Sequence, residues 1–403
     1  MEAWRKIRLG DACVTNADSY SPKEEWKFVN YLDTGNITDN RIDSIQYIDV
    51  ENDKLPSRAR RKVKKDSIIY STVRPNQRHF GIIKTQPENF LVSTGFAVID
   101  VDANVLNADF LYYLLTQPTL VETLHAIAEQ STSAYPSIKP SDIEDLEIEV
   151  PDLATQKRIA DILGSLDGKI AQNAAINENL LQQAIALYEH LIQNAEWPTA
   201  TILDVAEKVA MGPFGSNIKV STFVPEGVPI ISGNHLRGYF LEEPEFNYIT
   251  EEHAERLKNS IVYPHDLVFT HAGNIGQVAM IPDECKYDRY VLSQRQFYLR
   301  CDETKVVPEF LLMFFHSASG QHELLSYANQ TGVPSIAQPA SNLKKIPFKC
   351  PPMQEQLMWR EQVHPLLGRY LNNRLENERL SSLRDALLPQ LMSGELDVSD
   401  IDL

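Results

Sequence analysis

The most regular pattern of apolar positions lies in the proline-free stretch between Pro151 and Pro198. Residues of one stripe recur there at alternating steps of four and three, which is the a/d spacing of a coiled-coil helix. The stripe consists of Ile159, Leu163, Leu166, Ile170, Asn173, Asn177, Leu180, Ala184, Leu187 and Leu191. A helix from Gln156 to Gln193 would be about 57 Å long. That length predicts a spacer rather than an element of one small domain.

The same stripe recurs 200 residues further along the chain. Its members are Trp359, Val363, Leu366, Tyr370, Asn373, Asn377, Leu380, Arg384, Leu387 and Leu391. Both stripes carry two asparagines at the same places, and a polar seam residue lowers stability while it fixes register. We therefore predict an antiparallel helix pair in which Asn173 and Asn177 face Asn373 and Asn377. The simpler alternative is that each helix packs on its own globular domain, with the asparagines at caps or in solvent.

Two prolines, Pro365 and Pro389, occur only in the second helix. Proline removes a backbone donor and clashes with the preceding turn of a helix. We therefore predict that the second helix bends near Leu366 and ends near Pro389, with Ser393-Gly394 as its stop.

The helices belong to a longer duplication with the same offset of 200. A Pro-Ser-Ile triplet occurs at residues 136–138 and 334–336, and Pro151 and Gln156 match Pro351 and Gln356. Upstream, each copy has two strand-like segments followed by an apolar helix. These segments are residues 64–71, 96–101 and 108–115 in the first copy, and 263–270, 296–299 and 308–315 in the second.

The duplication predicts an α/β (α+β) protein with two globular domains and two long helices. The predicted domains are residues 1–150 and 198–350, and the predicted helical segments are residues 151–197 and 351–403. Duplicated halves usually assemble around a pseudo-two-fold axis, which would make the two helices antiparallel.

Composition is that of a folded protein, with 43% hydrophobic and 23% charged residues in 403. The formal charge is −17, and both halves are acidic: 20 basic against 29 acidic residues up to Trp197, and 18 against 26 beyond it. This argues against coating nucleic acid by bulk charge. Any affinity for DNA would depend on local basic loops and on partner proteins.

Export and membrane signals are not found in the sequence. No stretch approaches the roughly 20 apolar residues that span a bilayer, and the N-terminal residues lack the apolar segment of a signal peptide. The four cysteines are too scattered for a disulfide framework or a CxxC metal site. We expect a cytoplasmic protein with free thiols and no contact with membranes.

Catalytic motifs are also not found. The sequence has no phosphate-binding GxxxxGK[ST] loop, no GxGxxG and no Asn-Pro-Pro-Tyr or Asp-Pro-Pro-Tyr tetrapeptide of DNA methyltransferases. Asp283, Glu284 and Lys286 superficially match the carboxylate and lysine parts of a metal-dependent nuclease, but their adjacent placement is typical of a turn. The histidines show no paired metal-ligand spacing. We expect no catalytic group, no metal site and no cofactor bound by this chain.

Polar, turn-rich segments could instead bind DNA. Six positive charges lie between Arg58 and Lys65, and arginine, asparagine, glutamine and histidine can grip phosphates and read base edges. The alternative is a solvated loop in the first half and ordinary hairpin turns in the second. Candidate contacts of the first half are Arg58, Arg60, Arg61, Lys62, Arg74, Asn76, Gln77, Arg78 and His79. Those of the second half are Ser216, Asn217, Lys219, Asn234, His235, Arg237, His271, Asn274 and Gln277.

These segments and their twofold repetition carry a resemblance to a known family. A variable domain, Pro-Ser-Ile, Pro-x-[Leu/Met]-x-x-Gln and a long helix, all occurring twice, resemble the specificity (S) subunit of type I restriction-modification systems. Residues 212–217 (Gly-Pro-Phe-Gly-Ser-Asn), 266–276 and 387–396 are similar to phrases of that family. The first half departs from the usual Ala-Gly-x-Ile-Gly phrase and has Thr72-Val-Arg-Pro-Asn76 instead.

The resemblance implies a DNA-recognition subunit rather than an enzyme. Each variable half would be a target recognition domain that reads one part of a bipartite site in double-stranded DNA, and the helices would set the spacing. Two methyltransferase (M) subunits would supply S-adenosylmethionine binding and adenine-N6 methylation, and two restriction (R) subunits would supply ATP-dependent, magnesium-dependent cleavage. Two other hypotheses remain at this point: a nuclease built on Asp283, Glu284 and Lys286, and a scaffold that binds only protein.

Overall fold

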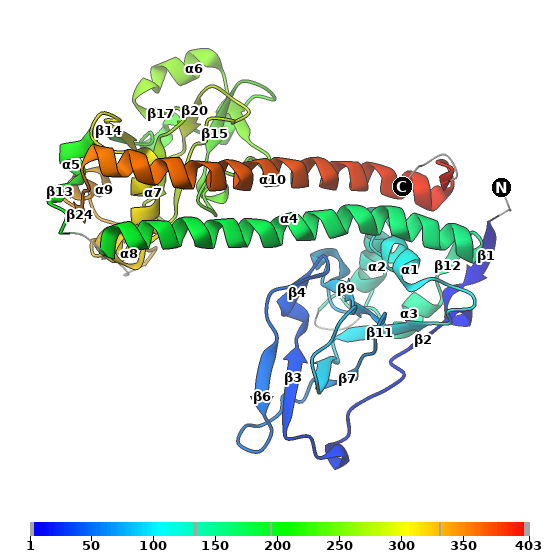
Figure 1. The fold of residues 1–403 in the computed structure, drawn as a ribbon. Helices are drawn as coiled ribbons and strands as arrows, with labels where there is room; N and C mark the ends of the chain where they lie inside the picture. Colours follow the sequence, from blue (N-terminus) through cyan, green and yellow to red (C-terminus); the bar gives the residue numbers. More distant parts are fainter. Residues whose placement is uncertain (1–3, 132–134, 194–195, 330–331, 399–403) are drawn as a thin grey trace. The chain divides into compact units, whose positions relative to one another are not determined.

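The computed structural model describes residues 4–131, 135–193, 196–329 and 332–398, apart from the side chain of Ser216. The chain divides into two compact units. Unit 1 comprises residues 1–174 and 374–403, and unit 2 comprises residues 175–373. Each unit contains a globular part and a segment of both long helices, α4 (Leu153–Gln193) and α10 (Met353–Ser393) (Figure 1).

Unit 1 is built on two four-stranded sheets. The first has the order β6 (Gln46–Asp49), β3 (Phe28–Leu32), β10 (Phe90–Ser93), β7 (Ala59–Lys62). The second has the order β2 (Cys13–Thr15), β11 (Phe96–Val101), β8 (Ile68–Ser71), β9 (Phe80–Ile82). Two further pairs are β1 (Arg5–Arg8) with β12 (Glu147–Val150), and the hairpin of β4 (Ile37–Thr38) and β5 (Arg41–Ile42).

Unit 2 repeats the strand order of both four-stranded sheets and the pairing of β1 with β12. Its first sheet has the order β16 (Asn247–Ile249), β15 (Val228–Ile231), β20 (Tyr290–Leu292), β17 (Ile261–Val262). Its second sheet has the order β14 (Ala206–Met211), β21 (Gln296–Cys301), β18 (Leu267–Thr270), β19 (Val278–Met280). The short pairs are β13 (Thr199–Thr201) with β24 (Pro347–Lys349), and β22 (Ala328–Asn329) with β23 (Ser335–Ile336). In each first sheet only the central pair is parallel, β3 with β10 and β15 with β20.

Among the described residues, three short helices follow the second sheet in each unit, and unit 2 has two more, α5 and α6, earlier in its chain. Unit 1 has α1 (Ala108–Leu115), α2 (Pro118–Glu129) and α3 (Pro140–Glu144). Unit 2 has α5 (Ile202–Val205), α6 (Glu251–Arg256), α7 (Pro308–His316), α8 (Ala318–Leu325) and α9 (Pro339–Leu343). The strand and helix segments predicted from the sequence are confirmed, α1 and β11 to the residue. None of the helices in the described ranges is long and apolar enough to cross a bilayer.

The hydrophobic core of each unit lies in layers. In unit 1, buried side chains such as Leu32, Phe90 and Val98 fill the space between the two sheets, because strands that are apolar on both faces pack between layers. A larger cluster joins the second sheet to α1, to the first turns of α4 and to the last turns of α10, where Leu391 is fully buried. The long helices are therefore part of the core of each unit.

A buried glutamine fixes the first turn of each long helix. Gln156 is fully buried; its carbonyl oxygen accepts the backbone N–H of Asn107 at 2.8 Å, and its amide donates to the Pro151 carbonyl at 2.9 Å. Gln356 repeats both hydrogen bonds in unit 2, to Val307 (2.9 Å) and Pro351 (2.8 Å). The Pro-x-x-x-x-Gln motif thus joins the long helix to the N-terminus of α1 or α7.

Within unit 1, residues 153–174 of α4 and 374–393 of α10 run antiparallel. The Asn173 amide donates to the Asn377 side-chain oxygen at 2.9 Å and to Glu376 at 2.7 Å, and the Asn377 amide donates to the Ile170 carbonyl at 3.2 Å. Nearer the start of α4, Arg384 pairs with Asp167 at 2.7 Å. The predicted stripe is the buried or half-buried face of both segments.

Within unit 2, the remaining segments pair in the same way. The Asn373 amide donates to the Asn177 side-chain oxygen at 2.8 Å, and the Asn177 amide donates to the Tyr370 carbonyl at 3.1 Å. Trp359 of α10 packs edge-on against Tyr188 of α4, with ring centroids 6.4 Å apart. The prediction that the two helices pair with each other in antiparallel fashion is confirmed in each unit.

The predicted end of the second helix, near Pro389 with Ser393-Gly394 as its stop, is confirmed. Helix α10 is unbroken at Pro365 and Pro389 and ends at Ser393, where Gly394 adopts a φ of +71°. Leu388, Leu391 and Met392 are buried in the core of unit 1, and this packing holds the last turns together despite the proline.

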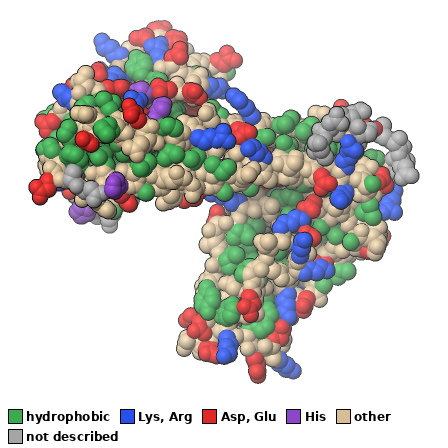
Figure 2. Space-filling model, in the orientation of Figure 1, with side chains coloured by type: hydrophobic (Ala, Val, Ile, Leu, Met, Phe, Trp, Pro, Cys, Tyr) green, Lys and Arg blue, Asp and Glu red, His purple; other side chains and the backbone are tan. Residues whose placement is uncertain are grey.

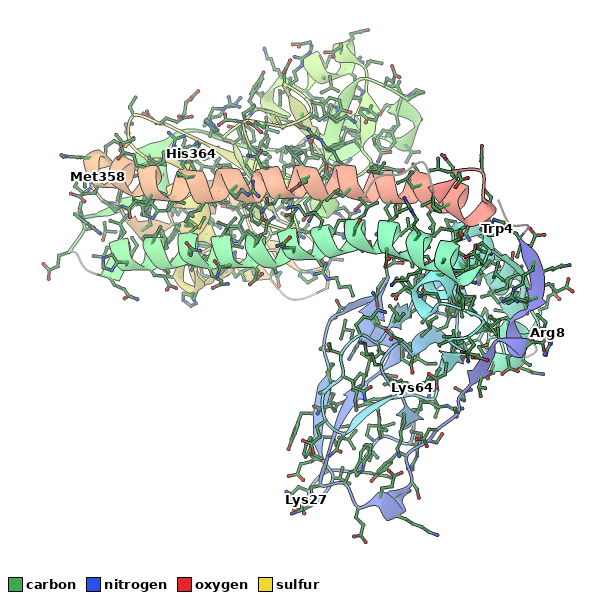
Figure 3. All side chains as sticks on the ribbon, turned by 45° about the vertical axis from the view of Figure 1, so that its right-hand side comes forward. Trp4, Arg8, Lys27, Lys64, Met358 and His364 are labelled. Atoms are coloured by element: carbon green, nitrogen blue, oxygen red, sulfur yellow. The ribbon has the colours of Figure 1, made fainter. Side chains whose placement is uncertain are left out.

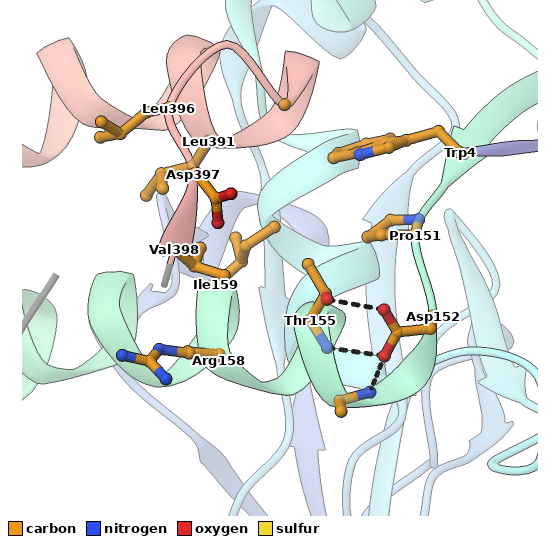
Figure 4. A pocket seen from close by; sticks show the side chains of 12 residues that line it. Trp4, Pro151, Asp152, Thr155, Arg158, Ile159, Leu391, Leu396, Asp397 and Val398 are labelled. Carbon is orange, nitrogen blue, oxygen red and sulfur yellow. Dashed lines mark hydrogen bonds between the residues drawn. The ribbon is translucent and has the colours of Figure 1, made fainter. Parts of the chain in front are cut away.

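Figure 4 shows a pocket of about 400 Å³ where α4 begins, lined by Trp4, Ile159 and Leu391 among others. Asp152 caps the helix: its carboxylate accepts the N–H of Ala154 at 2.8 Å and the Thr155 hydroxyl at 2.7 Å. The hydrogen bonds from the side chain and backbone of Thr155 lower the pKa of Asp152 below its ordinary value. In unit 2 the same place is occupied by Pro352, which has no capping side chain.

Candidate nucleic-acid interface

The first candidate surface is the loop of residues 72–79 between β8 and β9, here called loop A. Three backbone hydrogen bonds hold its start: Thr72 N–H to Gly95 O (2.8 Å), Ile138 N–H to Thr72 O (2.8 Å) and Arg74 N–H to Pro136 O (2.9 Å). The Pro-Ser-Ile triplet therefore acts as a β-bridge that clamps the loop. Because backbone atoms make these bonds, the loop side chains are free to vary.

Unit 2 contains the equivalent loop of residues 271–277 between β18 and β19, here called loop B. The hydrogen bonds correspond one for one: His271 N–H to Arg295 O (2.9 Å), Ile336 N–H to His271 O (2.8 Å) and Gly273 N–H to Pro334 O (3.0 Å). Both copies of the Pro-Ser-Ile triplet thus hold the start of their loop in the same way. Loops A and B therefore occupy the same place in each unit.

Other loops converge on loops A and B. In unit 1, Arg58 precedes β7 and its carbonyl accepts the N–H of Thr94, the neighbour of Gly95. In unit 2, Gly233 at the end of β15 approaches Gln277 so closely that a Cβ there would lie 3.3 Å from the Gln277 side-chain oxygen. Each unit thus presents loops from both sheets at one sheet edge.

The backbone of loop A is strained where that of loop B is not. Arg74 and Arg78 have φ values of +48° and +58°, in the left-handed region that non-glycine residues rarely adopt. Loop B has Gly273 and Gly276 at φ +88° in the corresponding turn. Strain of this kind costs roughly 1–3 kcal/mol per residue and clusters at functional sites.

The predicted basic run of residues 58–65 is not one continuous patch. Arg58 is exposed, whereas Arg60, Arg61 and Lys62 are half-buried along β7. Lys62 is ion-paired with Glu24 at 2.6 Å, and Arg61 donates to Ser19 at 3.4 Å. Lys64 lies on the surface of unit 1 (Figure 3).

Within loop A, the predicted contacts differ in their freedom. Asn76 and Gln77 are exposed on the 3-10 turn η4 (Pro75–Gln77). Arg78 is paired with Asp39 at 2.6 Å, and the His79 ring bonds the Ile37 carbonyl at 2.6 Å. The freer candidates of unit 1 are therefore Arg58, Arg74, Asn76 and Gln77.

The predicted contacts of unit 2 come from three loops. Exposed members are Asn217, Lys219, Asn234, Arg237 and Asn274. His271 and Gln277 are half-buried: the His271 ring contacts the Gln294 carbonyl at 3.1 Å, and Gln277 accepts the Thr270 hydroxyl at 3.2 Å. The Ser216 side chain lies outside the described part of the structure.

The side chain of His235 is buried, unlike those of the exposed predicted contacts. Its ring is only 4% exposed, stacks on Phe246 with centroids 4.4 Å apart, and accepts the Ser232 backbone N–H at 2.9 Å. Burial lowers the pKa of His235 below its ordinary value. A buried ring that caps its own turn is not exposed to a ligand, so His235 is left out of the contacts proposed below.

Two exposed aromatic residues were missed by the sequence reasoning. Tyr135, 61% exposed, precedes the Pro-Ser-Ile triplet of unit 1, and Phe214, 71% exposed, follows Gly212-Pro213 in unit 2. A signal for both was present, since aromatic side chains beside polar loops offer stacking surfaces for bases. Neither is needed for the hydrophobic core.

Charge on the molecular surface is mixed. On the face shown in Figure 2, lysine and arginine side chains are interspersed with acidic ones instead of forming one positive field. Free cations in a few loops, rather than bulk charge, are consistent with the net charge of −17.

The nuclease hypothesis finds no support in the geometry. The Asp283 carboxylate pairs with the His265 ring at 2.7 Å, while Glu284 and Lys286 are exposed. Among the described residues, no group of three or more His, Cys, Asp or Glu side chains is placed to hold a metal ion.

A duplicated two-sheet unit with loops at one sheet edge and two paired helices defines a recognition scaffold. The family model "Type I restriction modification DNA specificity domain" matches residues 1–182 and again 194–378. The chain belongs to this family and carries two copies of its domain. The family resemblance inferred from the sequence is confirmed.

Curated relatives and a solved structure agree with this assignment. The chain is 23% identical to the type I restriction enzyme HindI specificity subunit of Haemophilus influenzae, over 98% of this chain and 100% of that one. It is 24% identical to the MjaIX specificity subunit of Methanocaldococcus jannaschii, over 73% and 70%. The S subunit of a type I system from M. genitalium superposes with a TM-score of 0.58 at 15% identity, over 97% and 96%, which supports the fold.

The family assignment settles the broad class of activity. Specificity subunits of type I restriction systems recognise DNA and are not the catalytic subunits. This chain is accordingly a recognition subunit of such a system.

Proposed function

We propose that the chain reads a bipartite site in double-stranded DNA, with one half-site contacted by each unit. The observation that carries this proposal is the repetition of one backbone frame with different side chains. Loops A and B are held by the same three backbone hydrogen bonds, yet one presents Arg74, Asn76 and Gln77 while the other presents Gly273 and Asn274. Such a frame can read two different sequences.

The contacts we propose are the exposed polar residues of these loops. Arginine, asparagine and glutamine can make paired hydrogen bonds with guanine and adenine edges, and lysine can contact phosphate. In unit 1 they are Arg58, Arg74, Asn76 and Gln77; in unit 2 they are Asn217, Lys219, Asn234, Arg237 and Asn274. The half-buried candidates would act mainly by positioning the loops. They are Arg60, Arg61, Lys62, Arg78, His79, His271 and Gln277.

Chemistry would be supplied by partners docked on this chain. Two methyltransferase subunits would bind S-adenosylmethionine and methylate adenine, and two restriction subunits would use ATP and Mg²⁺ for cleavage. The long helices α4 and α10 would fix the spacing between half-sites. Asn173 with Asn377, and Asn177 with Asn373, would fix the helix register, since buried amide pairs disfavour slipped alignments.

The test is methylation sequencing of a host that co-expresses the chain with its methyltransferase subunit. The wild type should give two defined half-sites separated by a non-specific spacer. Insertion of one heptad into α4 after Ala174 and one into α10 after Asn373 falls between the two asparagine pairs. Because seven helical residues add about 10 Å, the spacer should grow by roughly 3 base pairs with both half-sites unchanged.

A matched control inserts the same heptad into α4 alone, which should abolish methylation because the helix pair can no longer align. If the double insertion altered the half-sites and left the spacer unchanged, the helices would not be the ruler. If the wild type gave no bipartite site, the proposed function itself would be wrong.

A further inference from the structure

Arg74 is an exposed cation in a part of unit 1 where other cations are paired. Arg78 is bound to Asp39 and Lys62 to Glu24, each at 2.6 Å. Among the described residues, no acidic side chain lies within ion-pair distance of Arg74. In a chain with 17 more acidic than basic residues, an arginine kept free of carboxylates is available for an anionic or polar ligand.

Several contacts restrain the backbone at Arg74. Its N–H is bound to the Pro136 carbonyl at 2.9 Å, Val73 forms a β-bridge with Ser137, and Pro75 fixes the next residue. These restraints hold Arg74 at a φ of +48°. A strained backbone that is locked from both sides fixes the direction in which the side chain leaves the loop.

The side chain is also oriented beyond the backbone. The Arg74 guanidinium lies 5.4 Å from the centroid of the Tyr135 ring, within the range of a cation–π contact. Tyr135 is 61% exposed, so this pair stands at the surface and is not part of the core. A guanidinium held over a ring by a cation–π contact keeps its hydrogen-bond donors available to a second planar group.

We propose that Arg74 reads one guanine in the half-site of unit 1 and that Tyr135 is the positioning residue for its guanidinium. Guanine presents two acceptors, O6 and N7, side by side in the major groove, and the two donors of an arginine fork match them. The inference rests on the proposed function, since it assigns one base contact within a DNA site read by unit 1.

Unit 2 has no counterpart of this pair. The position of Arg74 is taken by Gly273, which makes the same backbone hydrogen bond to Pro334, and the residue before the triplet is Val333. Loop B thus keeps the frame and lacks both the fork and the ring. The two half-sites should therefore differ at the equivalent base pair.

The experiment is selection from a duplex library with both half-sites randomised, using the full chain in complex with its methyltransferase subunit. The wild type should select a guanine at one position of one half-site. Replacement of that guanine by 7-deazaguanine, which lacks only the N7 acceptor, should weaken binding roughly 5- to 150-fold. Arg74→Lys, which keeps the charge and loses the planar fork, should weaken the guanine preference and keep every other position of the consensus.

Further variants separate reading from folding. Arg74→Gly copies loop B and relieves the strained φ, so its melting temperature should not fall below that of the wild type while the guanine preference disappears. Tyr135→Phe should keep the preference, and Tyr135→Ala should weaken it at that position alone.

Two results would overturn the inference. If Arg74→Gly lowered binding equally for all sequences and left the consensus intact, Arg74 would be a phosphate contact. If Arg74→Lys kept the guanine preference at full strength, the planar fork would not be the reader. A wild type that selected no consensus would overturn the proposed function as well, whereas a consensus independent of Arg74 would overturn only this inference.

Discussion

Units 1 and 2 share a backbone frame and differ in the side chains at equivalent places. The strand orders are the same, and so are the glutamine contacts at Asn107 and Val307. What the two units share consists mainly of backbone hydrogen bonds and buried glutamines. The backbone frame therefore depends on a few motif residues, and most of the other side chains on it can change.

One difference is a reversed ion pair. In unit 1, Asp66 at a φ of +68° pairs with Lys84 at 2.7 Å; in unit 2, His265 at a φ of +71° pairs with Asp283 at 2.7 Å. The backbone N–H groups of both turn residues donate to corresponding carbonyls, those of Ile83 and Ile281. The turn residue is an acid in unit 1 and a titratable histidine in unit 2, so the charges of the two partners are exchanged.

A second difference lies between the long helices. In unit 1, Asp167 accepts from Arg384 and from the Tyr113 hydroxyl, both at 2.7 Å. The repeat equivalents in unit 2 are Leu367, Ala184 and Met313, all buried. One unit therefore has a hydrogen-bonded polar cluster where the other has an apolar core.

The largest effect is expected at the buried glutamines. Gln156→Ala leaves the Asn107 N–H and the Pro151 carbonyl without partners, and each unmet buried group costs about 1–3 kcal/mol. The free energy of unfolding should fall by about 2–5 kcal/mol, and Gln356→Ala should have a similar cost. Urea denaturation followed by circular dichroism would measure both, with the exposed Gln172→Ala as the neutral control. A cost confined to one of the two units would show that the motif is not equivalent in them.

The polar cluster of unit 1 should be replaceable by the apolar set of unit 2. Arg384→Ala alone leaves Asp167 without its cation and should cost about 1–3 kcal/mol, because the pair is partly buried. The triple variant Tyr113→Met, Asp167→Leu and Arg384→Ala should regain most of that loss, since buried ion pairs are often no more stable than apolar packing. The same denaturation measurement checks this, with exposed Arg379→Ala as control. A triple variant less stable than Arg384→Ala would show that the cluster is required for packing.

The smallest effect is expected at His265. Burial lowers the pKa of the ring, but the hydrogen bond to Glu303 and the charges of Asp283, Glu303 and Glu309 outweigh it and raise the pKa above the ordinary 6.5. A raised pKa in the folded state stabilises the protein below pH about 6.5, and the gain is lost as the pH rises through the folded pKa. We expect about 0.5–1 kcal/mol, the size of a partly exposed ion pair.

The measurement is the melting temperature between pH 6 and 8 for the wild type and for His265→Asn, which tolerates the positive φ and does not titrate. The difference between the two proteins should shrink as the pH rises. A constant difference over this range would mean that the ion pair does not contribute.

Sequence reasoning was strongest where a pattern repeats. The helix stripe, the strands β8 and β11 and the place of the Pro-Ser-Ile triplet follow from periodicity and from the duplication, because local hydrophobic pattern determines them. The helix end at Ser393-Gly394 was predicted as well, although the packing of Leu391 and Met392 carries α10 past Pro389 to reach it. Sequence reasoning placed His235 at the interface, because composition cannot distinguish a loop histidine that faces solvent from one that is buried under Phe246.

Individual DNA contacts could not be predicted from the sequence for the same reason. The basic run of residues 58–65 reads as one patch, yet Lys62 is neutralised by Glu24, which is 38 positions away in the chain. Conversely, the contact of Arg74 with Tyr135 joins two segments that no spacing rule connects. Pairings between distant loops depend on the tertiary fold.

Unit 2 is one continuous stretch of chain inserted between two parts of unit 1. Both junctions fall inside the long helices, and each unit keeps both members of its own amide pair, Asn173 with Asn377 or Asn177 with Asn373. Recombination at these two junctions would therefore exchange a complete recognition half together with the residues that align its helices. A gene built in this way can acquire a new DNA specificity through two crossovers, one at each junction, without first evolving a new helix interface.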